Sequence, residues 1–124
     1  MATSRTPKKT LPKFYDQRVN VATAVDYTQR YRRSAPASEH AGFFYAKGLQ
    51  QLLAQPGVFG MRIYHGLDKN GRYRMVLVGV DQNGDDIVKA PPKRGTAKAR
   101  AAGDAFLLDS HFPCPPFCAT GSPL

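Results

Sequence analysis

The sequence is poor in the residues from which most catalytic sites are built. Among 124 residues it has three histidines, two cysteines and a single glutamate, Glu39. Carboxylate catalysis would therefore have to rely on aspartate. The chain contains no glycine-rich phosphate loop, no nucleophile elbow and no His-Glu-x-x-His pattern. We therefore expect a non-catalytic protein, assign no catalytic residue and expect no cofactor.

Long apolar segments are also missing. No run approaches the roughly 20 apolar residues that a membrane-spanning helix needs, so no membrane span is expected. Residues 1–13 are polar and basic and lack the apolar stretch of a secretory signal. Two neighbouring cysteines are too few for the disulfide framework of a small secreted domain. These features predict a cytoplasmic protein, and its length suits one domain.

What the chain does have is positive charge, concentrated in two segments. Residues 1–19 carry +4 and residues 89–100 carry +5, which accounts for the whole net charge of +9. The second segment offers five candidate residues for binding a polyanion such as a nucleic acid: Lys89, Lys93, Arg94, Lys98 and Arg100. Their spacing suits contacts with phosphates and includes no base-reading element. The alternative is two solvated segments that bind nothing.

The middle of the chain has the pattern of antiparallel strands. Residues 59–66 alternate between apolar and polar side chains, and residues 72–80 end in the apolar run Met75–Val80. Such a run needs cover on both faces, so we place it centrally in the sheet. Asn70-Gly71 and Asn83-Gly84 have the residue types of tight turns, and a third strand is expected directly after the second turn. The pattern predicts a meander.

Side chains of the first two predicted strands suggest a second possible surface for nucleic acid. Their tyrosines and arginines could form an exposed aromatic and basic sheet face, and the residues concerned are Arg62, Tyr64, Arg72, Tyr73 and Arg74. The alternative is ordinary cross-strand pairing in an unremarkable sheet.

Two helical segments precede the strands. Asn20 can cap a helix that begins at Val21, and residues 46–55 place Leu49, Leu52 and Leu53 on one face of a second helix. We therefore predict an α+β fold, with two N-terminal helices packed on one face of an antiparallel sheet of three to five strands.

The expected domain organisation follows from these elements and from the composition of the ends. Residues 20–110 form a single α+β domain that includes a basic loop at residues 89–103. A mobile basic arm, residues 1–19, precedes the domain, and a proline-rich and cysteine-containing tail, residues 111–124, follows it.

The segment Cys114-Pro-Pro-Phe-Cys118, which follows His111, is the most unusual stretch. Its prolines fix a bent backbone that could bring the two sulfur atoms together. The cysteines could be structural and inert, could form a disulfide, or could take part in redox chemistry or metal binding. A disulfide across so short a loop would stabilise the fold only a little. A structural zinc site needs four ligands, and beyond His111 only His40 and His65 remain as histidine donors.

Three stretches together resemble a group of small, uncharacterised bacterial proteins. They are Gly60-Met-Arg-Ile-Tyr-His-Gly66, the hairpin sequence from Met75 to Asp85, and Cys114-Pro-Pro-x-Cys118. The similarity covers roughly residues 20–118. It implies a single domain and carries no activity over to this chain.

These observations lead to three functional hypotheses. We expect a small binding protein that recognises a protein partner or a second copy of itself, because the exposed edge of a small sheet can pair with another strand. The alternative is polyanion binding through residues 1–19 and 89–100. A further alternative is a thiol, disulfide or metal role for Cys114 and Cys118.

Overall fold

The described part of the chain combines two helices with two antiparallel sheets. The computed structural model describes residues 11–34, 40–90, 103–110, 112–116 and 118–124. Its elements in chain order are α1 Val21–Ser34, β1 Ala41–Phe43, α2 Ala46–Leu53, β2 Gly60–Leu67, β3 Tyr73–Val80, β4 Leu108–Asp109 and β5 Phe112–Cys114. The fold is α+β, as the sequence predicts. Within the described residues no helix has the length and apolar character to cross a membrane.

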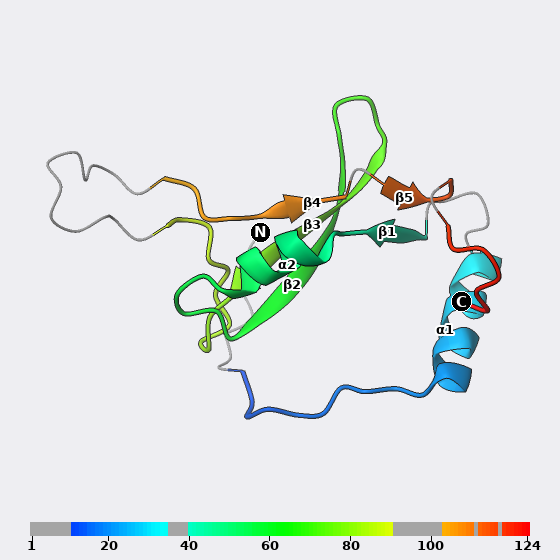
Figure 1. The fold of residues 1–124 in the computed structure, drawn as a ribbon, viewed down its shortest axis with the longest axis horizontal. Coiled ribbons are helices and arrows are strands. Elements are labelled where there is room, and N and C mark those ends of the chain that lie inside the picture. The colour runs from blue at the N-terminus through cyan, green and yellow to red at the C-terminus, as the bar shows by residue number, and fades with distance from the viewer. Residues whose placement is uncertain (1–10, 35–39, 91–102, 111, 117) are drawn as a thin grey trace, which may run out of the picture.

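The strands are divided between a three-stranded sheet and a two-stranded sheet (Figure 1). In the larger sheet β3 lies between β2 and β4, and in the smaller one β1 pairs with β5. The single sheet expected from the sequence is thus replaced by two. Sequence patterns within one strand predict that the strand exists, whereas they do not specify a partner that is 70 residues away.

The apolar run at the end of β3 lies in the centre of the larger sheet, as predicted. Leu77 and Val78 are 2% exposed and Val80 is 3% exposed. The pairing of β2 with β3 is continuous from Gly60 opposite Val80 to Leu67 opposite Tyr73. The hairpin of β2 and β3 therefore has the longest ladder among the described strands.

The two predicted Asn-Gly turns have the same construction. In the first, the Asp68 carboxylate accepts hydrogen bonds from the backbone N–H groups of Asn70 and Arg72, and Asp81 does the same for the second turn. Within these two turns only the glycines, Gly71 and Gly84, have positive φ, with values of 80° and 88°. Each turn is therefore a three-residue loop that ends in a left-handed glycine, a common way to close a hairpin.

The third strand of the predicted meander is replaced by shorter contacts. After the second turn the chain makes one bridge, between Val80 and Asp86, and the third strand of the sheet is β4 instead. A second bridge joins Lys89 to Asp104. The two ends of the predicted basic loop therefore lie side by side, while residues 91–102 of that loop lie outside the described residues.

The helices differ in how they pack. The side chain of Asn20 accepts a hydrogen bond from the Thr23 N–H at 2.8 Å and caps α1, as predicted. Helix α1 has no buried residue, whereas α2 buries Leu52 completely and contacts β3 and β4. Helix α2 alone therefore covers the face of the larger sheet, and α1 lies beside the C-terminal segment (Figure 1). The polar sequence of α1 offers too narrow an apolar face for core packing.

Candidate functional site

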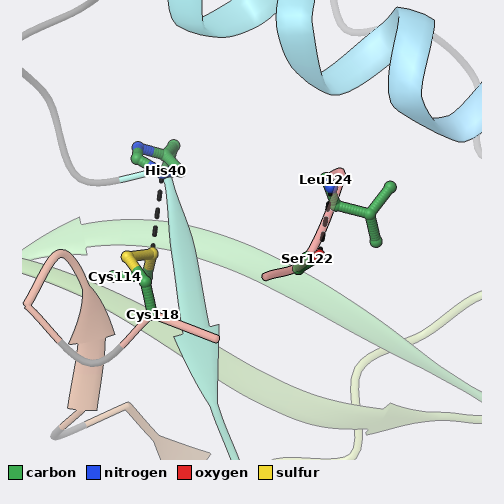
Figure 2. The surroundings of a disulfide bond; sticks show 5 residues. All are labelled: His40, Cys114, Cys118, Ser122 and Leu124. Carbon is green, nitrogen blue, oxygen red and sulfur yellow. Dashed lines mark hydrogen bonds between the residues drawn. A yellow bond between two sulfur atoms is a disulfide. The ribbon is translucent and has the colours of Figure 1, made fainter. Parts of the chain in front are cut away.

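The most unusual cluster of side chains joins the C-terminal cysteines to a histidine from the N-terminal half of the chain. Cys114 and Cys118 form a disulfide, with their Cα atoms 4.7 Å apart. The Nε2 atom of His40 lies 3.6 Å from the Cys114 sulfur (Figure 2). The disulfide is one of the interpretations that the sequence left open, and the structure contains it. The structure also places His40 next to Cys114.

The backbone fixes the position of His40 next to Cys114. His40 directly precedes β1, and its N–H donates to the carbonyl oxygen of Cys114 at 2.9 Å. The next residue, Ala41, is paired with Cys114 in the ladder of β1 and β5. Two segments that are 74 residues apart in the sequence thus meet through ordinary strand pairing. In the sequence His40 is one of several possible donors, and the pairing of β1 with β5 is what places it next to Cys114.

The cluster lines a cavity of about 760 Å³. Its walls come from α1, β1 and the C-terminal segment, and they include Tyr27 and Tyr31 of α1. Cys114 is buried, with 8% of its surface exposed, whereas Cys118 is exposed. The disulfide therefore joins an exposed residue, Cys118, to a buried one, Cys114, which lies beside His40.

Of the other two histidines, the structure describes only His65, which is not part of this cluster. His65 lies on β2, where its Nδ1 atom is 2.7 Å from the hydroxyl oxygen of Tyr73. His111, which the sequence offered as a third donor, lies outside the described residues. The described metal-ligating side chains that gather here are His40, Cys114 and Cys118, with donor atoms within 4.8 Å of one another.

The candidate polyanion-binding residues can be placed only in part. Lys89 is exposed and lies opposite Asp104 at the base of the loop. The remaining four candidates, Lys93, Arg94, Lys98 and Arg100, lie outside the described residues, as do residues 1–10 of the basic arm. Polyanion binding through these two segments therefore stays a prediction.

The proposed aromatic and basic sheet face is divided between two sides of the sheet. Leu67 pairs with Tyr73 and Tyr64 pairs with Val76, so strand alternation places Tyr64 and Tyr73 on opposite faces. This finding corrects the expectation that the five residues share one surface. Adjacent strand positions alternate in direction, and the register of the hairpin decides which positions coincide.

Two arginines of that proposed surface are engaged by aspartates. Arg62 forms an ion pair with Asp86, whose carboxylate also accepts a hydrogen bond from the Tyr64 hydroxyl. The hydrogen bond to Asp86 is the main reason why the pKa of Tyr64 lies above its ordinary value. The same carboxylate, through its hydrogen bond, raises the pKa of Arg62. The positive charge of Arg62 is thus neutralised locally.

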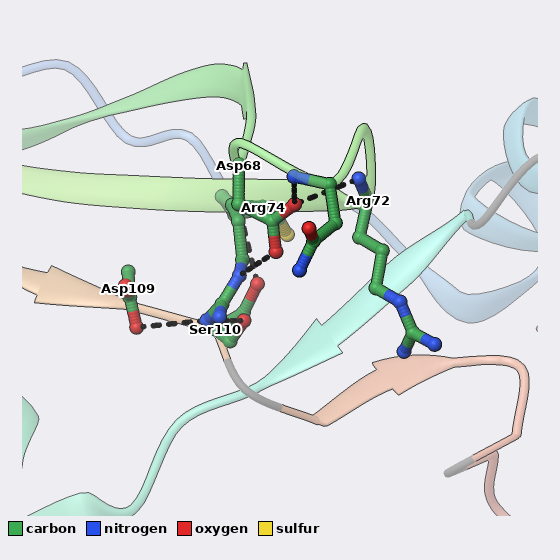
Figure 3. A network of polar contacts seen from close by, with 7 residues as sticks. Asp68, Arg72, Arg74, Asp109 and Ser110 are labelled. Carbon is green, nitrogen blue, oxygen red and sulfur yellow. Dashed lines mark hydrogen bonds and ion pairs between the residues drawn. The ribbon is translucent and has the colours of Figure 1, made fainter.

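Arg74 is held in a second polar network (Figure 3). Its guanidinium lies 3.4 Å from a carboxylate oxygen of Asp68 and 3.4 Å from one of Asp109, and it donates to the Ser110 carbonyl oxygen at 3.2 Å. The pKa of Asp68 is lowered, chiefly by the hydrogen bond from the Arg72 backbone N–H, with smaller contributions from the Asn70 N–H and from Arg74. This network ties the first turn to the chain after β4.

The outer edge of β2 is the other unusual surface. In the sheet order β2-β3-β4, β2 is an edge strand of eight residues. No described strand pairs with its outer side. Several of its large apolar side chains are exposed, among them Met61, Ile63 and Leu67. Edge strands of this kind are ready to pair with another strand.

Comparisons with family models, with curated proteins and with solved structures found no match to this chain. The function therefore has to be argued from the edge of β2 and from the cluster of His40 with the two cysteines.

Proposed function

We propose that this protein is a small non-catalytic binding protein that associates with a second copy of itself through the outer edge of β2. The observation that carries the proposal is an eight-residue edge strand whose outer side is not paired with any described strand. Main-chain hydrogen bonds across such an edge supply affinity, and the side chains beside it supply specificity.

The N–H and C=O groups of β2 that point away from β3 belong to alternate residues and are available to a second strand. The N–H of Ser110, which directly follows β4, donates to the carbonyl oxygen of Met75 in β3 at 3.0 Å. Odd-numbered residues of β3 therefore point their backbone groups toward β4, and even-numbered ones point toward β2. With Tyr64 opposite Val76, the even-numbered residues of β2 bond to β3. The N–H and C=O groups of Met61, Ile63 and His65 then face the open edge.

The edge of β2 lacks the features that usually prevent such pairing. Its sequence, GMRIYHGL, contains neither proline nor lysine, and its ladder with β3 runs without a bulge. Its one permanently charged side chain, Arg62, is paired with Asp86. Met61, Ile63 and Leu67 are 38%, 46% and 73% exposed and share one face of the strand. Apolar surface next to an open edge favours burial by a partner.

Antiparallel pairing of two β2 strands suits a second copy as the partner. An edge that pairs with itself in antiparallel orientation generates a two-fold symmetric dimer, the commonest oligomer of soluble proteins. A register centred on Ile63 would place Met61 and Ile63 of both copies on one face of a continuous sheet. In this register Ile63 lies directly opposite Ile63 of the second copy and Met61 lies opposite its His65, and a cross-strand apolar pair such as Ile63 with Ile63 contributes about 0.2–1 kcal/mol.

The test compares two substitutions of Ile63 in the full chain. Ile63→Pro removes an N–H that faces the open edge and leaves the hydrogen bonds to β3 intact, whereas Ile63→Ala keeps the N–H and removes the side chain. Sedimentation equilibrium should show dimers of the wild type and a dimer dissociation constant raised about tenfold or more by Ile63→Pro, since each copy loses one interstrand hydrogen bond.

The Ile63→Ala variant should weaken the dimer less than Ile63→Pro does. Circular dichroism and urea unfolding of each variant show that the hairpin itself is intact. A wild type that stays monomeric at high protein concentration would contradict the proposal. So would a dimer on which Ile63→Pro and Ile63→Ala have the same effect, because the backbone edge would then play no part.

A further inference from the structure

We propose that the reduced form of this protein binds a zinc ion through His40, Cys114 and Cys118. This inference concerns a different part of the molecule from the edge of β2 and does not depend on self-association. Imidazole and thiolate are the ligands that zinc prefers, and the chain offers one of the former and two of the latter in one place.

The distances between the donor atoms fit a common metal ion. A tetrahedral zinc ion with a Zn–S bond of about 2.3 Å and a Zn–N bond of about 2.1 Å separates the sulfur from the nitrogen by about 3.6 Å. The His40 Nε2 atom lies 3.6 Å from the Cys114 sulfur. All three donor atoms lie within 4.8 Å of one another. Only the two sulfur atoms, which are bonded in the oxidised form, would have to move apart.

The arrangement that brings His40 to Cys114 does not depend on the disulfide. It rests on the antiparallel ladder between β1 and β5 and on the hydrogen bond from the His40 N–H to the Cys114 carbonyl oxygen. Reduction would leave these backbone contacts in place. The short segment from Cys114 to Cys118 keeps the second thiol close, because its Cα atoms are 4.7 Å apart. The ligands are therefore largely preorganised before zinc binds, which lowers the entropic cost of binding.

Three protein ligands leave a fourth coordination position open. Zinc sites with three protein ligands and one exchangeable position bind water or a small polar ligand there. The three residues line the cavity of about 760 Å³, so there is room for such a ligand. Tyr27 and Tyr31 of α1 also line this cavity.

The chemistry requires a two-electron reductant, such as a dithiol or a phosphine. A dithiol reduces the Cys114–Cys118 bond to two thiols and is itself oxidised to a disulfide. Zinc then replaces the two thiol protons, which pass to solvent, and binds the unprotonated Nε2 atom of His40. In the oxidised form the two sulfur atoms are bonded to each other and provide no thiolate. Zinc binding is therefore expected to depend on the redox state.

The experiment titrates the full chain with Zn²⁺ against a chromophoric chelator, once after reduction with a phosphine that binds zinc weakly and once in the oxidised form. The reduced wild type should bind one equivalent, and the oxidised form should bind none at this site. Since the loss of a second-shell partner already costs about 10- to 100-fold, loss of a direct ligand in His40→Ala or Cys118→Ser should weaken binding by about 100-fold or more.

His65→Ala is the matched control, since His65 lies on β2 and contacts Tyr73 of β3, and its loss should leave zinc binding unchanged. Substitution by Co²⁺ supplies a second measurement, because the intensity of the sulfur-to-cobalt charge-transfer band reports the number of thiolate ligands. It should halve in Cys118→Ser. Reduced wild type that binds no Zn²⁺ would overturn the proposal. Binding that Cys118→Ser or His40→Ala leaves unchanged, or that His65→Ala abolishes, would do the same.

Discussion

Gly42 of β1 and Met75 of β3 meet where the two sheets touch. A Cβ atom on Gly42 would lie 2.8 Å from the Met75 sulfur and 3.2 Å from the Cβ atom of Ser110. Glycine at this position therefore allows the smaller sheet, which carries His40 and Cys114, to pack against the larger one. The contact joins the sheet that carries His40 and Cys114 to the sheet whose edge strand is β2.

Gly42→Ala is expected to destabilise the protein by about 1–2 kcal/mol, because the added methyl group overpacks the junction between the sheets. The Met75 sulfur belongs to a flexible side chain and can shift, which keeps the cost at this level. Gly60→Ala is the control, since nothing lies within 4 Å of its added Cβ atom. Urea unfolding, monitored by circular dichroism, measures the stability of both variants. Equal stabilities for the two variants would contradict the close approach.

Ser110→Ala is expected to cost about 1–3 kcal/mol of unfolding free energy, because it leaves a buried N–H group without its acceptor. The Ser110 hydroxyl oxygen accepts from the Met75 N–H at 2.9 Å, and Ser110 is 1% exposed. The exposed Ser34, whose hydroxyl bonds to the Tyr31 carbonyl oxygen at the end of α1, provides the control. Ser34→Ala should change stability by less than about 0.5 kcal/mol. A larger loss of unfolding free energy in Ser34→Ala than in Ser110→Ala would contradict a stabilising role for the Ser110 hydroxyl.

Leu52→Ala and Leu53→Ala should differ strongly although the two residues are neighbours on α2. Leu52 is 0% exposed and Leu53 is 50% exposed. Removal of a fully buried leucine side chain costs about 2–5 kcal/mol, which includes the cavity left behind. Removal of the exposed Leu53 side chain should cost well under half as much unfolding free energy. Thermal and urea unfolding of the two variants decide whether α2 packs on the sheet through the face described.

Asp68→Asn should destabilise the protein at neutral pH and lose this effect in acid. The carboxyl pKa of Asp68 lies below its ordinary value of 3.8 in the folded protein, chiefly because of the hydrogen bond from the Arg72 N–H. The ionised carboxylate therefore adds stability above the unfolded pKa, and this stability is lost as the pH falls through the folded pKa. The asparagine variant can keep part of the turn bonding but cannot form the ion pair with Arg74.

The check is urea unfolding of wild type and Asp68→Asn between about pH 7 and about pH 2, a range that brackets ordinary carboxyl pKa values. The stability difference should shrink below about pH 4. Asp26→Asn, which breaks an exposed i,i+4 pair with Arg30 on α1, serves as the surface control. A stability difference for Asp68→Asn that stays constant down to the lowest pH would show that charge plays no part.

Salt should separate self-association from polyanion binding. Two copies that each carry +9 repel each other, so added salt should leave the dimer unchanged or strengthen it. Binding of a labelled DNA duplex through the five basic residues of segment 89–100 should weaken steeply, with a log–log slope of about −4 to −5 if all five contact phosphates. Sedimentation and fluorescence anisotropy at several salt concentrations measure the two. A dimer that dissociates as salt is added would contradict pairing through the nearly neutral edge of β2.

Several elements of the fold could be predicted because their causes are local. Asn20 caps the helix that begins at Val21, through a contact three residues away. The two turns follow from aspartate, asparagine and glycine within five positions of each other. The apolar run of β3 needs cover on both faces wherever it lies, which explains its central and buried place in the sheet.

The tertiary structure alone decided which distant residues meet. The pairing of β1 with β5 brings His40 to Cys114, and the pairing of Arg62 with Asp86 neutralises a charge that looked available in the sequence. The place of β4 beside β3, and with it the open edge of β2, was likewise not visible in any local pattern. Helix caps and turns form between residues a few positions apart, and an apolar run needs burial wherever it lies. The local sequence therefore predicts all three. Contacts between segments far apart depend on how the whole chain closes, so a histidine or an arginine carries no local mark of its partner.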